Sequence, residues 1–364
     1  MSEDFEGLEG VVAARTVLSD VDGAAGRLVI RGLSLDELVG ATPFEEAIRL
    51  LWSGFFEGLP ENLTAPLGAA RAEVFAQTKA LDGDLVARPP LEAMRALTAR
   101  LADGDDLATA LRLVAAPAVF TAAVVRAQAG EASLAPDPAA GHSADILRMT
   151  RGKSASNAEA AALDAYLVTV CDHGLNASTF AARVVASTLP GLTSAVLAGI
   201  GALKGPLHGG APGPVIDMLD AIGSPQNARS WLEAALDRGD RLPGFGHRVY
   251  RVRDPRADAL KRTVRVMGAG SNVLPGRLAF AEAVESAALD ILKTRKPGRS
   301  LQTNVEFYTA LLLEALGFPP SAFTCIFAMG RTAGWIAHAR EQIATGRMIR
   351  PQSVYVGPQP RVAA

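Results

Sequence analysis

Apolar residues at helical spacing are the feature that most limits what this chain can fold into. From Ser34 onward they recur in one segment after another, together with signals for helix starts. Ser34 with Glu37 three residues later has the spacing of a capping box, and the Thr42-Pro43 step, followed by two glutamates, predicts a second helix start. The pattern predicts an all-α protein.

The composition favours packed helices over sheets. Apolar residues make up 49% of the chain and aromatic residues only 5%. Alanine and leucine, which are strong helix formers, are abundant, whereas a β-sandwich would need more aromatic residues and threonine. Only residues 10–34, with several glycines and β-branched side chains, are expected to form an irregular or short-strand entry to the fold.

The chain is long enough for two cores, since it has 364 residues. Long helical patterns are predicted over 158–188, 190–204, 303–316 and 320–345, with shorter helical segments between 213 and 293. A glycine cluster at 205–213 and the GFPPS step at 317–321 are expected to be domain junctions. We predict a large domain of residues 1–208 plus 318–364 and an inserted small domain of residues 209–317, with ligands bound in the cleft between them.

Charge and cysteine content exclude several classes of protein. The net charge is −2, and the most basic stretch, Lys293 to Arg299, is short and broken by Pro297, so no nucleic-acid partner is expected. Cys171 and Cys325 lie far apart in apolar stretches and are expected to be buried free thiols. The start of the chain is acidic, unlike a signal peptide, and the longest apolar stretches are expected to fall short of a membrane span. We therefore expect a soluble cytoplasmic protein with no membrane partner.

Three of the five histidines lie in distinctive surroundings, and histidine suits proton transfer near neutral pH. His208 lies in a run of glycines, which allow close approach to a substrate. His247 follows a Pro-Gly-Phe-Gly turn and precedes four arginines, which suit anionic ligands. His173 is predicted inside a helix beside Asp172. Read singly, each has a plain alternative: a polar loop histidine, a histidine of a solvated basic loop, and a satisfied core histidine.

Other common site motifs are missing from the sequence. It contains no His-x3-His or Cys-x2-Cys spacing, so no metal site is expected. RGKS at 151–154 lacks the earlier glycine of a phosphate loop, and no G-x-S-x-G elbow is present.

Several segments, taken together, resemble the citrate synthase family in its short bacterial and archaeal form. The segments are DHGLNAS, GPLHGG, GFGHRVY with DPRAD, NVEFY, and GRTAGWIAH with RPQSVYVGP, preceded by GLEGVVAARTVLSDVDG and LVIRG. They occur in the family's order and spacing and cover nearly the whole chain. The resemblance implies a two-domain helical fold and an acyltransferase that condenses acetyl-CoA with oxaloacetate and hydrolyses citryl-CoA to citrate and CoA.

The resemblance also implies roles for individual residues. His208 would stabilise the enol of the thioester, and His247 would polarise the ketone of oxaloacetate. The residues expected to hold oxaloacetate are His173, Asn176, Arg256, Arg331 and, reaching across a homodimer from the other subunit, Arg350. Asn176 is expected on the same helix face as His173. CoA would be a co-substrate with no permanently bound cofactor, held by Leu242, Pro243, Gly244, Phe245, Gly246 and Arg251.

The catalytic base is the one important departure from the family pattern. The family's usual base is an aspartate in an N-V-D step, whereas this chain has Asn304-Val305-Glu306. The extra methylene moves the carboxylate by about 1 Å, a shift that can cost on the order of 100-fold in rate unless the backbone compensates. Glutamate is as able a base as aspartate, so Glu306 is read as the base of a subfamily.

Two alternative functions remain open at this point. A 2-methylcitrate synthase would use propionyl-CoA in place of acetyl-CoA, and one methylene discriminates by only about 1–3 kcal/mol. A weakly active paralogue that binds CoA or oxaloacetate and regulates a partner is motivated by Glu306, although such a binder would not need His208.

Overall fold

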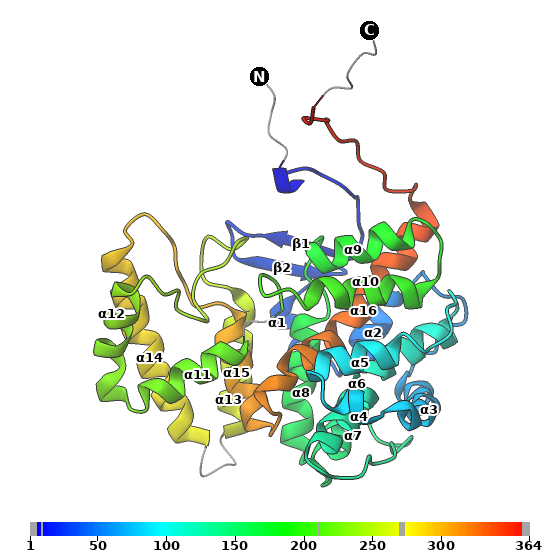
Figure 1. Cartoon of the computed structure of the whole chain (residues 1–364), viewed down its shortest axis with the longest axis horizontal. Coiled ribbons are helices and arrows are strands. Elements are labelled where there is room, and N and C mark those ends of the chain that lie inside the picture. The colour runs from blue at the N-terminus through cyan, green and yellow to red at the C-terminus, as the bar shows by residue number, and fades with distance from the viewer. Residues whose placement is uncertain (1–5, 9, 210–211, 269–273, 359–364) are drawn as a thin grey trace.

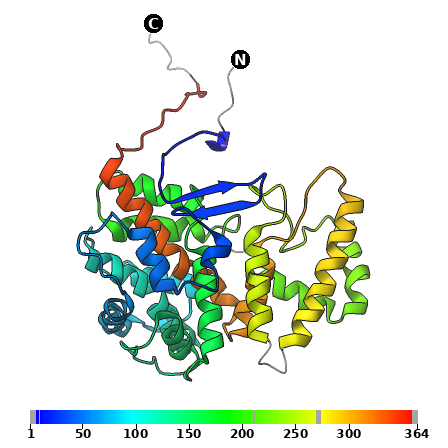
Figure 2. The same ribbon diagram turned by 180° about the vertical axis from the view of Figure 1, so that it is seen from behind.

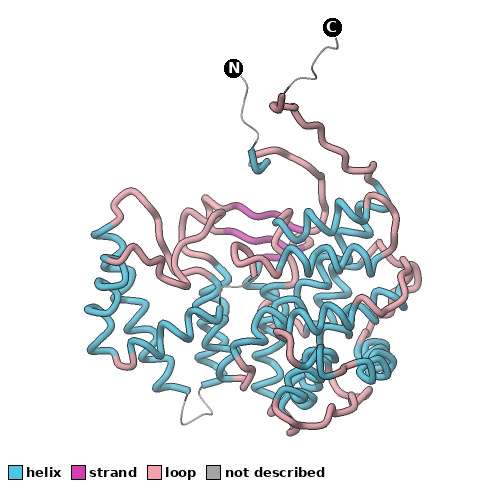
Figure 3. The backbone as a smooth tube through the Cα atoms, viewed as in Figure 1, coloured by secondary structure: helices cyan, strands magenta, loops and turns pink. Residues whose placement is uncertain are grey.

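The computed structural model describes residues 6–8, 10–209, 212–268 and 274–358. Helices dominate this part of the chain, and the strands are short and confined to the N-terminal region (Figure 3). The prediction of an all-α fold with a short-strand entry is therefore confirmed.

The N-terminal region forms a small antiparallel sheet of β1 (Ser19–Asp22), β2 (Arg27–Ile30) and β3 (Leu33–Ser34), in that order. Its register pairs Ser19 with Ile30 and Asp22 with Arg27. Helix α1 (Leu35–Leu38) follows, and the predicted capping box is present, since Ser34 and Glu37 hydrogen bond to each other's backbone N–H groups. The second predicted start is confirmed in α2 (Phe44–Trp52), which begins directly after Pro43.

One group of helices lies around α16, which runs through its middle (Figure 1). α16 packs against α2, α6, α8, α9 and α10, so the C-terminal helix is the centre of this core. The helices of this group are α3 (Thr64–Phe75), α4 (Gly83–Val86), α5 (Pro90–Thr98), α6 (Leu107–Gln128), α7 (His142–Arg151), α8 (Asn157–Val170), α9 (Ala177–Ala186), α10 (Leu192–Leu203) and α16 (Phe323–Thr345), with 3-10 turns at Ala76–Ala80 and Pro320–Ala322.

A second group of helices gathers at the left of Figure 1. α13 lies between the groups, because it packs against α15 and α14 on one side and α8 on the other. The members are α11 (Pro212–Ile222), α12 (Ala228–Asp237), α13 (Pro255–Gly268), α14 (Leu274–Arg295) and α15 (Val305–Ala315), with a 3-10 turn at Pro225–Asn227. The expectation of only shorter segments here is wrong for α14, which has 22 residues.

The predicted continuous helix over 158–188 is wrong. The structure divides it into α8 and α9, with residues 171–176 as a loop. Gly174 in this loop has φ +59°, a left-handed conformation that a continuous helix does not contain. The Asn176 side chain caps α9 by accepting from the N–H groups of Ser178 and Thr179. His173 therefore lies in a loop, so it does not share a helix face with Asn176.

Helix α6 corrects the expectation that no apolar stretch reaches the length of a membrane span. Its length and mean hydropathy of 1.8 over 18 residues meet that criterion, but 83% of this stretch is buried inside the protein. Its apolar character is that of a core helix packed against α3, α5 and α16. The expectation for the cysteines is confirmed, since Cys171 and Cys325 are both free and buried.

The two ends of the described chain leave the body on the same side (Figure 2). After α16, residues 346–358 run as an extended tail with no helix or strand. Met348, Val354, Tyr355 and Val356 of this tail are exposed, as are Val12 and Val17 near the N-terminus.

Candidate active site

His173 is held at the junction of α8 and α9. Its side chain is buried, and its Nε2 atom lies 3.0 Å from the hydroxyl oxygen of Tyr250. The Asn176 amide donates back to the His173 carbonyl oxygen at 3.4 Å. Burial lowers the pKa of His173 well below its ordinary value, and the positive charges of Arg256 and Arg331 act in the same direction. The ring is therefore neutral at physiological pH.

His247 lies in the loop before α13, with its ring 5.9 Å from that of His173. Its Nδ1 atom accepts from the backbone N–H groups of Val249 and Tyr250, at 3.0 and 3.1 Å. A neutral imidazole has one acceptor nitrogen, so the proton is on Nε2. Nε2 nevertheless lies 3.1 Å from a guanidinium nitrogen of Arg256, which is also a donor. The unsatisfied Nε2–H is thus ready for an acceptor oxygen on a ligand.

Burial is the main reason that the His247 ring is neutral. Burial lowers the pKa of His247 to about 4, and the nearby Arg256 contributes further. A neutral ring donates a hydrogen bond from Nε2 without carrying a charge, which suits polarising a carbonyl group.

Asp254 is a site residue that sequence reasoning missed, although it stands in the quoted DPRAD segment. It is buried and accepts from Nε and Nη2 of Arg256 at 3.0 and 2.9 Å. It also accepts from the N–H of Val305 at 3.0 Å. Asp254 therefore joins the start of α13, which carries Arg256, to the start of α15, which carries Glu306.

Glu306 lies in the first turn of α15, where its backbone N–H donates to the capping side chain of Asn304 at 3.0 Å. Burial raises the pKa of its carboxyl group to about 7, with Arg256 opposing the rise and Asp254 adding to it. A carboxyl group with a pKa near neutrality is a far stronger base than an exposed one. Glu306 is therefore matched to proton abstraction at physiological pH.

Glu285 of α14 supports the segment that carries Glu306. Its buried carboxylate accepts from the hydroxyl groups of Thr303 at 2.7 Å and Tyr308 at 2.5 Å, on either side of Glu306. It also pairs with Arg253 and Lys261 at 2.9 Å each. Nothing in the sequence pointed to Glu285, because its partners lie in three separate segments.

His208 follows α10 and is half-buried. Its Nε2 atom lies 2.7 Å from the Ser178 hydroxyl oxygen. This hydroxyl group donates to Asn176 Oδ1 at 2.8 Å and accepts from the Trp335 indole at 3.1 Å. Because Nε2 is held by Ser178, Nδ1 is the nitrogen left for a ligand. Burial lowers the pKa of His208 to about 4, helped by Arg331, so this ring is neutral too.

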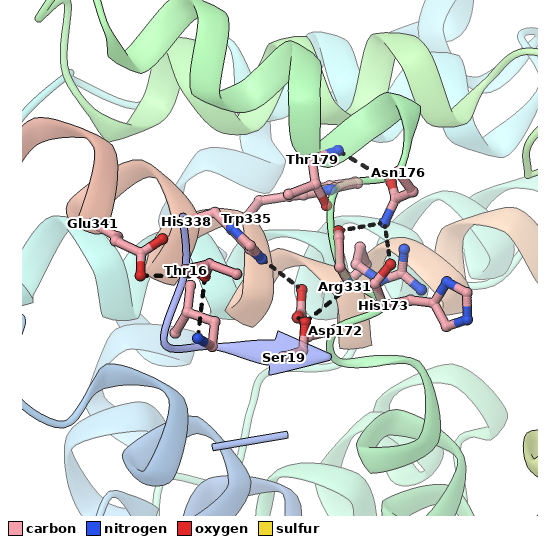
Figure 4. Close-up of polar contacts among 12 residues, drawn as sticks. Thr16, Ser19, Asp172, His173, Asn176, Thr179, Arg331, Trp335, His338 and Glu341 are labelled. Atoms are coloured by element: carbon pink, nitrogen blue, oxygen red, sulfur yellow. Dashed lines mark hydrogen bonds and ion pairs between the residues drawn. The ribbon is translucent and has the colours of Figure 1, made fainter. Parts of the chain in front are cut away.

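Arg331 is a buried cation with an open binding face. Its Nε donates to the Val170 carbonyl oxygen at 2.6 Å, and its guanidinium group lies 4.8 Å from the centre of the Phe327 ring. Within the described ranges, this bond from Nε is the one hydrogen bond that the guanidinium group makes. Burial lowers the pKa of Arg331 to about 10, although Asp172 favours the cation. Figure 4 shows its guanidinium group beside His173 and Asn176, where an anion would satisfy it.

The loop 242–246 lies against the start of α15. Gly246 donates to the Gln302 carbonyl oxygen at 2.7 Å, and Asn304 donates to the Gly244 carbonyl oxygen at 2.9 Å. Gly244 and Gly246 both have φ +84°, which other residues adopt only with strain. Arg251 is exposed, and its N–H donates to the Gly23 carbonyl oxygen at 2.8 Å.

The structure brings most of the predicted site residues together but leaves one apart. His173, His247, Arg256 and Glu306 meet between the two helix groups, and the charges of Arg256 and Arg331 act on His208. Arg350 is exposed in the C-terminal tail, which runs away from the body (Figure 1). No metal-binding group of three or more His, Cys, Asp or Glu side chains occurs among the residues described.

Known proteins resemble this chain over nearly its whole length. The family model described as "Citrate synthase, C-terminal domain" matches residues 7–352. A citrate synthase of Haloferax volcanii is 39% identical, over 96% of this chain and 95% of that protein. A 2-methylcitrate synthase of Mycobacterium tuberculosis is 34% identical, over 98% of this chain and 91% of the relative.

Solved structures agree with the family model. The citrate synthase of Thermotoga maritima superposes with a TM-score of 0.83 at 31% identity, covering 99% of this chain and 98% of that one. The citrate synthase of Thermoplasma acidophilum, solved with carboxymethyl coenzyme A and oxaloacetate, gives 0.85 at 27% identity, covering 100% and 99%. The fold, the sequence and the family model agree with the resemblance seen in the motifs, and the chain belongs to the citrate synthase family.

Proposed function

We propose that this enzyme condenses acetyl-CoA with oxaloacetate and hydrolyses the resulting citryl-CoA to citrate and CoA. The observation that carries the proposal is the half-buried carboxyl group of Glu306, which has a pKa of about 7 and lies beside Arg256 and close to two histidines that are neutral. A weakly acidic methyl group needs such a base, together with donors that stabilise the developing enolate.

Glu306 and His208 act on the thioester. The Glu306 carboxylate takes a proton from the methyl carbon, and the electron pair moves toward the thioester oxygen. His208 donates from Nδ1 to that oxygen once the Ser178 hydroxyl group turns its proton from Asn176 Oδ1 to Nε2 of His208. The neutral ring stabilises the enol without giving up its proton fully.

His247 and the arginines act on oxaloacetate. The enol carbon forms a bond to the ketone carbon while the Nε2–H of His247 hydrogen bonds to the ketone oxygen. That oxygen gains one proton overall, which balances the proton that Glu306 has removed. Arg256, Arg331, His173 and Asn176 hold the carboxylates. Water then breaks the thioester bond, which releases the CoA thiol. When a carboxylate binds Arg256, the donor-to-donor contact between Arg256 and His247 is relieved.

The loop Leu242–Gly246 and Arg251 hold CoA in this proposal. Two glycines leave the backbone of the loop open to a flat or anionic group. The loop is hydrogen-bonded to the segment before Glu306, so a CoA molecule on it would direct its acyl end toward the base. The Thermoplasma acidophilum neighbour carries a CoA derivative and oxaloacetate together.

The domain division and the assembly belong to the same proposal. Residues 1–208 with 318–364 form the large domain and residues 209–317 the small one, which closes over the substrates. The enzyme acts in the cytoplasm as a homodimer, with Arg350 supplied across the interface. Exposed apolar side chains on the tail around Arg350 support this, because they need a surface to cover them.

A second candidate function is 2-methylcitrate synthesis from propionyl-CoA, favoured by the 34% identical relative of that name. One methylene in an apolar pocket changes selectivity by about 1–3 kcal/mol. The two activities therefore differ in degree.

The release of free thiol tests both candidates. The enzyme is mixed with oxaloacetate and either acetyl-CoA or propionyl-CoA, and kcat/KM is compared for the two thioesters. A higher value for acetyl-CoA is expected, and a higher value for propionyl-CoA would favour the second candidate. Thiol release no faster than that of a His208→Ala variant would contradict both and favour a regulatory paralogue.

A further inference from the structure

A continuous, partly buried network joins the N-terminal segment to α16 and to the loop that carries His173 (Figure 4). It contains His338 and Asp172, two titratable groups that have no part in the proposed reaction. Within this network, Ser19 of the N-terminal motif hydrogen bonds to Asp172, which lies 153 positions away in the sequence.

One end of the network is a buried ion pair between Arg183 of α9 and Glu341 of α16, at 2.6 Å. Arg183 also lies 2.9 Å from Nδ1 of His338. A guanidinium group only donates, so Nδ1 must accept and the His338 proton is on Nε2. Nε2 lies 3.1 Å from Oδ1 of Asp172, to which it therefore donates.

Asp172 connects these residues to the loop that carries His173. Its second oxygen, Oδ2, accepts from the hydroxyl group of Ser19. The Ser19 oxygen accepts in turn from the backbone N–H of Gly174 at 3.0 Å. Burial opposes ionisation of Asp172, but the hydrogen bonds from His338 and Ser19 hold its pKa below the ordinary value. The chain of donors thus ends on the peptide bond that directly follows His173.

The N-terminal segment is anchored to the same helix. The backbone N–H of Val17 donates to Glu341 at 2.8 Å, and the Thr16 hydroxyl group donates to the same oxygen at 3.2 Å. α16 lies close against the loop, since a Cβ atom on Gly334 would be 2.2 Å from the Cys171 carbonyl oxygen. The loop therefore has little freedom to move away from Ser19.

We propose that Ser19, Asp172 and His338 are positioning residues for oxaloacetate binding, acting on His173 through the backbone N–H of Gly174. None of them touches the substrate. The proposal rests on the assignment of oxaloacetate to His173, Arg256 and Arg331. Fixing the loop before the ligand arrives lowers the entropy lost on binding, so loss of the fixation weakens binding.

Ser19→Ala is the most direct test, because it removes only the hydroxyl group that bridges Asp172 and Gly174. We expect KM and the directly titrated Kd for oxaloacetate to rise about 10-fold, the effect of one lost hydrogen bond of about 1.4 kcal/mol. The KM for acetyl-CoA and kcat at saturation should stay within about 2-fold of wild type, since the thioester side is untouched. Ser19→Thr keeps the hydroxyl group and should restore oxaloacetate binding.

Ser156→Ala is the matched control. Ser156 also contacts a carboxylate, Glu159, at 2.9 Å, but it lies at the opposite end of α8. It should lower stability without changing either KM. Equal oxaloacetate affinity in Ser19→Ala and wild type, or a matching rise in the KM for acetyl-CoA, would overturn the proposal.

Two further variants separate the possible failures. Asp172→Asn keeps the side-chain shape and should weaken oxaloacetate binding in the same selective way. It therefore tests the positioning role even where Ser19→Ala folds poorly. Arg331→Ala tests the assignment of the site itself. Unchanged oxaloacetate binding in Arg331→Ala would contradict the proposed function. Weakened binding in Arg331→Ala, together with unchanged binding in Ser19→Ala and Asp172→Asn, would contradict only the positioning role.

Discussion

Asp172 and Glu306 are both carboxyl groups largely removed from water, yet their surroundings drive them in opposite directions. Asp172 accepts from His338 and Ser19, and its pKa is held below the ordinary value in spite of burial. Among the residues that the structure describes, Asn304 alone acts on the Glu306 carboxyl group by hydrogen bonding, and burial raises its pKa to about 7. The comparison shows that hydrogen bonding distinguishes the two roles. A carboxyl group with several hydrogen-bond donors supports the structure, and one with few is left able to react.

The histidines repeat the contrast. Both ring nitrogens of His338 have a partner of the correct kind, so its tautomer is determined by the surrounding protein. His247 instead has donors on both sides of a ring that can accept from only one. The region around His338, where every polar group named here has a hydrogen-bond partner, stabilises the fold. The region around His247, where the Nε2–H group has no acceptor in the described part of the chain, is ready to bind a ligand.

Replacing the unsatisfied carboxyl group should have the largest effect. We expect Glu306→Gln to lower kcat by about 1,000-fold, because it removes the base and keeps the shape. The Kd of oxaloacetate, measured by titration calorimetry, should stay within about 2-fold of wild type. A rate near that of the wild type would show that the base is another residue, and Glu306 would then not differ from Asp172 in reactivity.

The stability of the same variant sharpens the contrast. An unfolded glutamate ionises above about 4.5, whereas folded Glu306 keeps its proton up to about 7. The folded state therefore binds more protons between these values, and its stability falls with rising pH, by about 3 kcal/mol over the whole interval. Glu306→Gln should be more stable than wild type at pH 8, as judged by chemical denaturation, and lower stability would contradict the raised pKa.

Crowding the satisfied region should act on stability. Gly334→Ala would place a Cβ atom 2.2 Å from the Cys171 carbonyl oxygen and 2.9 Å from Asp172 Oδ1. We expect a loss of about 1–3 kcal/mol in the free energy of unfolding. Gly276→Ala in α14 is the control, because no atom of the described residues lies within 4 Å of its Cβ position. Equal stability of the two variants would show that α16 and the His173 loop are not in tight contact.

The pH dependence of the rate is the mildest probe. Glu306 must be ionised to take a proton, so kcat should fall below a midpoint near pH 7, by about 10-fold per pH unit at the acid limit. The remaining rate of Glu306→Gln should lack this limb. A wild-type midpoint near 4.5 would mean that substrate binding restores an ordinary carboxylate.

Local patterns were sufficient for much of the fold. The helical class, the capping box at Ser34 and Glu37 and the start of α2 were all predicted, because each depends on neighbours within a few residues. The histidines were found because they lie in conspicuous glycine- and arginine-rich segments. The prediction of a continuous helix over 158–188 failed because the apolar period continues past Val170, where α8 ends, and through Gly174, whose φ of +59° is incompatible with a helix.

The sequence by itself determined the helical class, the family and which side chains deserved notice, since these are written in short-range patterns and motifs. Only the tertiary structure decided that α6 is buried, that Ser19 meets Asp172, and that Glu285 supports the segment carrying Glu306. It also decided the pKa of Glu306, which depends on burial and on Arg256 and Asp254. Burial and contacts between distant segments exist only once the chain has packed, so no local pattern contains them.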